Sequence, residues 1–138
     1  MKFLFIVQGE GRGHLTQAIS LAHLLRKQGH EICEVLVGKS SSRQLPAFFT
    51  EKIKAPICRF ESPNFLPTPK NKRNNLAKSI AYNLVKLPAF IRSTRFIQKR
   101  IRQSQADAVI NFYELLTGLT YALHSISRLR NKTTDKLL

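Results

Sequence analysis

The hydrophobic pattern alternates between short apolar runs and longer stretches with helical spacing. The first run, 3–7, is continuous, rich in aromatic and β-branched residues, and too short for a helix, which is typical of a strand buried on both faces. Further apolar runs predict strands at 31–37 and 107–112, and a weaker one at 55–60. Helices are predicted at 15–27, in a short segment through Phe48 and Phe49, at 75–103 and at 115–126. Pro88 should kink the long helix or start a second one there.

Strands that alternate with helices predict a parallel sheet, because right-handed crossovers place consecutive strands side by side. The expected fold is α/β and Rossmann-like, with strand order 3-2-1-4 and helices on both faces. At 138 residues there is room for one domain, which we place at 1–126, followed by an aperiodic basic tail at 127–138. Because doubly wound sheets usually carry more strands, we expect this domain to be truncated.

The net charge of the chain indicates what kind of molecule it binds. The chain has 23 Lys and Arg against 8 Asp and Glu, a net charge of +15, which indicates an anionic partner such as a phosphate-bearing ligand, nucleic acid or an acidic membrane face. The longest uncharged stretch late in the chain, 115–127, is too short to span a membrane, so any membrane contact should be peripheral. Cys33 and Cys58 lack metal-ligand spacing and indicate reduced core thiols in a cytoplasmic protein.

Three glycines at alternate positions, Gly9, Gly11 and Gly13, separate the first strand from its helix. Such a turn directs backbone N–H groups and a positive helix end into the crevice above the sheet. The dinucleotide fingerprint requires a wider glycine spacing and an acid after the second strand, where this chain has Gly38 and Lys39. No Gly-Lys-Ser/Thr closes the turn, so a P-loop is excluded as well.

The stretch 8–18, which reads QGEGRGHLTQA, resembles the first glycine loop of GT-B glycosyltransferases that use sugar nucleotides. That group includes the lipid-linked peptidoglycan N-acetylglucosaminyltransferase, the diacylglycerol glucosyl- and galactosyltransferases and the UDP-glucuronosyl/glycosyl transferases. The resemblance implies that the chain is the N-terminal, acceptor-side half of such an enzyme. A nucleotide-sugar donor, expected to be a UDP-sugar, would bind mainly to a C-terminal half, and no metal is implied.

The resemblance also assigns roles to residues. His14 matches the histidine that acts as acceptor base in the inverting members, and a neutral imidazole can accept a hydroxyl proton. An acid orients that histidine in those members, and Glu114 is the ionisable candidate after the fourth strand. The other reading of His14 is a helix residue whose ring only packs or caps. Contacts to the donor diphosphate or the acceptor headgroup are expected from the glycine loop and the helix start: Gly9, Gly11, Arg12, Gly13 and Thr16.

Between 62 and 106 there are ten Lys and Arg and no Asp or Glu. Basic residues beside large apolar ones suit a helix that lies on an anionic bilayer, although a solvated helix face is the simpler reading. Nucleic acid is not expected, because no recognition-helix or zinc pattern is present. The predicted membrane-contact residues are Lys86, Phe90, Arg92, Arg95, Phe96, Lys99 and Arg102.

Together these features predict part of a transferase that is inactive without a donor-binding half and acts on a lipid-linked or membrane acceptor. The chain would be cytoplasmic, with peripheral contact at the cytoplasmic membrane face. The missing half is explained either by a truncated gene product or by a split enzyme of two chains, as in the dolichol pathway. The competing class is a non-enzymatic basic module that binds anionic membrane surfaces through residues 70–102.

Overall fold

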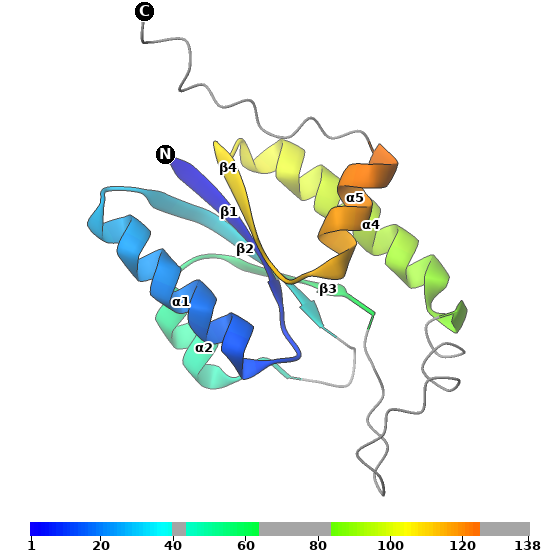
Figure 1. Cartoon of the computed structure of the whole chain (residues 1–138), viewed down its shortest axis with the longest axis horizontal. Helices are drawn as coiled ribbons and strands as arrows, with labels where there is room; N and C mark the ends of the chain where they lie inside the picture. The colour runs from blue at the N-terminus through cyan, green and yellow to red at the C-terminus, as the bar shows by residue number, and fades with distance from the viewer. Residues whose placement is uncertain (40–43, 64–83, 125–138) are drawn as a thin grey trace, which may run out of the picture.

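Four parallel strands form the centre of the structure, a computed structural model that describes residues 1–39, 44–63 and 84–124. Figure 1 shows the sheet between two layers of helices, with α1 and α2 on one face and α4 and α5 on the other. In chain order the elements are β1 (Lys2–Gln8), α1 (Arg12–Lys27), β2 (Glu31–Lys39), α2 (Ala47–Ile53), β3 (Ile57–Glu61), α4 (Leu87–Ser104), β4 (Ala108–Phe112) and α5 (Leu115–His124).

The sheet has the order β3-β2-β1-β4, which confirms the predicted α/β Rossmann-like arrangement. All three strand pairs are parallel; β1 pairs with β2 from Lys2↔Glu31 and with β4 from Phe3↔Ala108. From β1 the chain first adds β2 and β3 on one side of the sheet, and then returns to place β4 on the other side of β1. In open α/β sheets ligands bind beyond the carboxyl ends of the strands at such a switch point, so this edge is where a site is expected.

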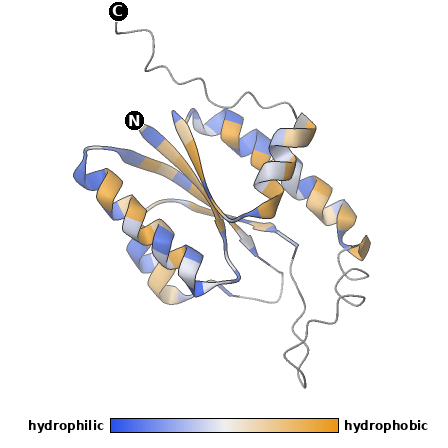
Figure 2. Ribbon diagram, in the orientation of Figure 1, coloured by the Kyte–Doolittle hydropathy of each residue, from blue (hydrophilic) through white to orange (hydrophobic). Residues whose placement is uncertain are grey.

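Strand β1 divides its side chains between two hydrophobic clusters, as a strand covered on both faces must. Phe3, Phe5 and Val7 pack with residues of α1 and α2, while Leu4 and Ile6 pack with residues of α4 and α5. These five are at most 9% exposed. Figure 2 shows the same partition, with apolar strands and helices that turn polar residues outward.

The start of α1 differs from the predicted one, whereas the start of α4 matches one of the two roles predicted for Pro88. α1 begins at Arg12 rather than at residue 15, because Gly11 already serves as its extended N-cap (φ −115°, ψ 135°). α4 begins at Leu87 with Pro88 in its first turn, a position where the missing N–H of proline costs nothing. Pro88 therefore starts a helix. Residues 75–83 of the predicted long helix, and the tail at 127–138, lie outside the described residues.

An ion pair between the buried Glu34 and the partly exposed Arg100 connects α4 to the sheet. The carboxylate of Glu34 is 5% exposed and accepts hydrogen bonds from Arg100 Nε (3.0 Å) and Nη2. Cys58 Sγ donates to the same carboxylate at 3.0 Å, and this bond, with burial, raises the pKa of the Cys58 thiol. Cys33 and Cys58 are both free, half-buried thiols. Glu34 thus joins β2, β3 and α4.

Candidate functional site

The glycine turn after β1 begins with a close approach between two strands. The Gly9 amide donates to Gly38 O at 2.7 Å, and a Cβ at Gly9 would lie 2.7 Å from Val37 Cγ1. The next amide, of Glu10, donates to Gln8 Oε1 at 3.3 Å. Gly9 was expected to contact a ligand, but its amide is used within the sheet, so its role here is to let the turn pack against β2.

Most of the other residues that were predicted from the sequence to bind substrate lie at the start of α1. Arg12 and Gly13 are exposed, and α1 has neither a side-chain N-cap nor an acid in its first turn. The positive end of the α1 dipole therefore lies at the carboxyl edge of the sheet, and no acidic side chain of α1 neutralises it. Thr16 Oγ1 donates back to Arg12 O at 3.0 Å. Arg12, Gly13 and Thr16 line an open groove that reaches Phe112 at the end of β4.

His14 lies in this turn as the third residue of α1 and is half-buried. Its ring packs on Gly11, where an added Cβ would lie 3.5 Å from His14 Cδ2, and on Tyr113, with ring centroids 4.8 Å apart and planes inclined by 34°. The Nδ1 atom is buried and has no hydrogen-bond partner among the described residues. Packing against these two residues, and not a hydrogen bond through Nδ1, therefore holds the imidazole within the described part of the chain.

Tyr113 was not selected as a site residue from the sequence. It follows β4 directly, is 75% exposed, and has a left-handed backbone with φ +59°. Two hydrogen bonds between the Asn111 side chain and the Glu114 backbone, at 2.9 and 3.1 Å, hold the turn around it. Its position at the carboxyl end of a strand was the available signal, because side chains there reach the crevice.

Glu114 is buried at the junction of three strand ends. Its Oε1 accepts from Ser62 Oγ at 2.6 Å and from the Leu116 amide at 3.2 Å, and its carboxyl group lies directly over Gly38. Burial raises the pKa of Glu114, and the charge of Glu10 adds to this, although the hydrogen bonds from Ser62 and Leu116 oppose the shift. Its other oxygen, Oε2, is buried without a partner among the described residues, which favours the neutral acid.

The expected pairing of Glu114 with His14 is not formed. The Nδ1 of His14 and the Oε2 of Glu114 each lack a hydrogen-bond partner within residues 1–39, 44–63 and 84–124. The carboxyl group lies over Gly38, which has no side chain, and its Oε1 accepts from Ser62 Oγ. The aromatic ring of Tyr113, not a carboxylate, is the neighbour that β4 supplies to His14.

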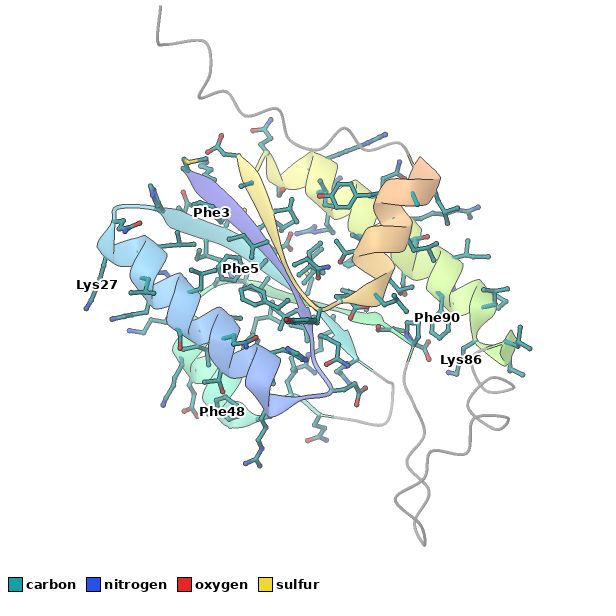
Figure 3. The ribbon with its side chains drawn as sticks, in the orientation of Figure 1. Phe3, Phe5, Lys27, Phe48, Lys86 and Phe90 are labelled. Atoms are coloured by element: carbon teal, nitrogen blue, oxygen red, sulfur yellow. The ribbon has the colours of Figure 1, made fainter. Side chains whose placement is uncertain are left out.

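The seven predicted membrane-contact residues divide into three groups: two phenylalanines that pack in the protein, one ion-paired lysine and four exposed cations. Phe90 is 5% exposed in the core, and Phe96 packs against Phe60 with ring centroids 6.4 Å apart, so the expectation that they face a bilayer is corrected. They fall on the sheet side of α4. Figure 3 shows Phe90 and Lys86 at the start of this helix, where Lys86 Nζ pairs with Glu61 Oε1 at 2.6 Å. The remaining four are exposed: Arg92, Arg95, Lys99 and Arg102.

The solvent-exposed side of α4 also carries two apolar residues that were not among the predicted membrane-contact residues. Leu87 is 50% exposed and Ile91 is 43% exposed. Helical spacing places both on the same side as the four exposed cations. We call this surface the α4 face: Leu87, Ile91, Arg92, Arg95, Lys99 and Arg102. Among the described residues, no helix combines the length and apolar character needed to cross a membrane.

No family model, curated protein or solved structure matches the chain. Fold and site geometry therefore define its class: an α/β protein with a Rossmann-like parallel sheet. Its candidate site lies at the carboxyl edge of β1 and β4, where His14 and Tyr113 meet. Within the described residues no cluster of His, Cys, Asp and Glu could hold a metal ion.

Proposed function

We propose that the chain is the acceptor-side part of a GT-B glycosyltransferase, which moves a sugar from a nucleotide-sugar to a lipid-linked or membrane acceptor. The observation that supports this best is the placement of His14. Its imidazole lies on the first turn of α1, at the switch point of the sheet, and forms no hydrogen bond through Nδ1 within the described residues. The glycine loop that precedes it carries the resemblance to these transferases.

In this proposal His14 accepts the proton of the acceptor hydroxyl as that oxygen attacks the anomeric carbon of the donor sugar. The bond from that carbon to the diphosphate breaks, and the nucleoside diphosphate leaves with the bonding electrons. The hydroxyl must come within hydrogen-bond reach of Nε2, because Nδ1 is buried. Arg12 and the uncompensated end of the α1 dipole would favour a phosphate nearby. Glu114 is proposed to shape the turn that carries Tyr113 rather than to take part in proton transfer, because the whole residue is 1% exposed.

The 138 residues are expected to transfer no sugar by themselves, because in the resembled enzymes the donor nucleotide binds mainly to a second Rossmann-like unit. Incubation of the purified chain with a panel of UDP-sugars and lipid acceptors tests this. Measurable turnover would refute the assignment to an acceptor-side half.

A second experiment tests acceptor binding. Flotation with neutral vesicles, with and without a polyprenyl-diphosphate-linked sugar or diacylglycerol, should show a preference for one acceptor. His14→Ala should weaken that preference, because the side chain lies at the proposed hydroxyl site. His23→Ala is the matched control, since His23 is exposed on the same helix and away from its first turn. Equal loss in both variants, or no acceptor preference in the unmodified chain, would contradict the proposal.

The α4 face supports membrane attachment as part of this function. Exposed aliphatic side chains beside four cations on one side of a helix match the pattern of an interfacial helix. Each cation near an anionic bilayer contributes about 1 kcal/mol, and the attraction is screened by salt. We expect binding to phosphatidylserine vesicles to fall steeply when Arg92, Arg95, Lys99 and Arg102 are changed to Gln.

The matched control changes four exposed cations away from α4 to Gln, so that net charge falls equally: Lys2, Lys27, Lys52 and Lys54. Equal loss of binding in both variants would mean that total charge, and not the α4 face, binds the bilayer. The alternative function, a non-enzymatic module for anionic surfaces, is favoured if vesicle binding is strong while no acceptor preference is found.

A further inference from the structure

Tyr113 presents an aromatic ring to solvent beside the proposed base. Its side chain is 75% exposed, although its ring lies against that of His14 at a centroid distance of 4.8 Å. The contact with His14 thus covers only part of the tyrosine surface. Large aromatic side chains usually bury most of their area, and an exposed one at the carboxyl edge of a parallel sheet lies where ligands bind.

The backbone of Tyr113 is unfavourable for a bulky residue. Three non-glycine residues of the described chain have positive φ: Lys54 (47°), Gln105 (49°) and Tyr113 (59°). Lys54 and Gln105 are the C-caps of α2 and α4, where a left-handed residue ends a helix. Tyr113 ends no helix, because it connects β4 to α5. The Asn111–Glu114 hydrogen bonds hold it in this conformation. Residues strained in this way cluster at functional sites.

We propose that Tyr113 is a sugar-contacting residue, whose exposed ring packs against the C–H face of a pyranose held at His14. This inference rests on the proposed function. A base that takes the proton of the attacking hydroxyl must lie within a few ångströms of the anomeric carbon, because oxygen and carbon are about to bond. The transferred pyranose is therefore beside His14, and Tyr113 is the aromatic residue in contact with that imidazole. An aromatic face is electron-rich and attracts the polarised C–H groups of a sugar ring.

The inference is tested by saturation-transfer NMR on the full chain with methyl glycosides of glucose, galactose and N-acetylglucosamine. We expect the ring protons of at least one glycoside to receive saturation. Tyr113→Ala should weaken that binding about fivefold to tenfold, and Tyr113→Phe should retain it, because the ring and not the hydroxyl makes the contact. Leu115→Ala is the matched control, since Leu115 is 70% exposed two residues away.

Tyr113→Gly separates a ligand role from a structural one. Glycine adopts positive φ without strain, so this variant should unfold at a higher temperature than Tyr113→Ala and no lower than the unmodified chain, while it loses glycoside binding. A Gly variant less stable than the unmodified chain would mean that the ring serves the fold, and would overturn the inference. Equal binding by the unmodified chain and Tyr113→Ala would overturn it while leaving the transferase proposal intact. Absence of all glycoside binding would overturn the inference, and the acceptor-vesicle experiment would then decide the proposed function separately.

Discussion

The contact between Glu114 and Gly38 offers the sharpest test of the structure. A Cβ added at Gly38 would lie 2.6 Å from Glu114 Cδ and 2.9 Å from Phe60 Cε2. Real Cβ atoms do not approach so closely, and Gly38 does not have a positive φ, so the effect of Gly38→Ala is steric. Because the end of β2 is buried, the added methyl group must displace the Glu114 side chain.

The magnitude follows from what Glu114 would lose. Overpacking of a well-packed interior costs about 1–3 kcal/mol. A displaced carboxyl group also gives up the hydrogen bonds from Ser62 Oγ and the Leu116 amide, each worth about 1 kcal/mol net. Gly38→Ala should therefore lower the free energy of unfolding by about 3 kcal/mol.

Urea denaturation followed by far-UV circular dichroism measures this loss, since the chain contains no Trp. In a Glu114→Ala background the contact with the carboxyl group is gone while that with Phe60 remains, so the cost of Gly38→Ala should shrink by about 2 kcal/mol. Gly118→Ala is the matched control: it lies inside α5 with open space around it, and should stabilise the chain by about 0.5–1 kcal/mol. An equal cost of Gly38→Ala in both backgrounds would refute the contact.

Two further predictions concern the buried carboxyl groups of Glu34 and Glu114. Arg100→Leu leaves the Glu34 carboxylate buried without its cation, and should lower the free energy of unfolding, measured by urea denaturation, by about 3 kcal/mol. Adding Glu34→Gln to the Arg100→Leu variant should recover most of this loss. Absence of any recovery would contradict the ion pair. The pKa of Glu114 is raised in the folded state, so above pH 4.5, the ordinary pKa of Glu, the folded protein keeps a proton that the unfolded chain has lost. The free energy of unfolding therefore falls as the pH rises from 4.5 to the pKa of the folded state. Denaturation of Glu114→Gln from pH 4 to 8 should lack this component, and parallel pH profiles for both proteins would disprove the shift.

Strand order was predictable because it depends on periodicity and connection rules that are local in sequence. The buried run at 3–7 marked the central strand, and right-handed crossovers then fixed β3-β2-β1-β4. Pro88 was equally informative, since a proline that suits only a first turn begins α4. The start of α1 was missed by three residues, because glycines at 11 and 13 conceal a helix that Gly11 itself caps.

The side-chain contacts of the site were not predictable, because they join residues that are distant in the chain. Glu114 meets Ser62 across 52 positions, and the space for its carboxyl group exists only because residue 38 is glycine. The orientation of Phe90 depends on which face of α4 meets the sheet, and its apolar neighbours Leu87 and Ile91 fit the periodicity almost as well. His14 was selected from its glycine loop, but its aromatic neighbour was visible only in three dimensions.

The central position of β1 has a consequence for how the chain folds during synthesis. β1 can pair with β2 soon after translation begins, but its other partner, β4, follows much later: Lys2 bonds to Asp107 across 105 positions. Until then the apolar run of β1 keeps one unpaired edge, and such edges promote aggregation. Parallel pairing at this sequence separation is also slow. The nascent chain should therefore depend on chaperones until β4 has emerged from the ribosome.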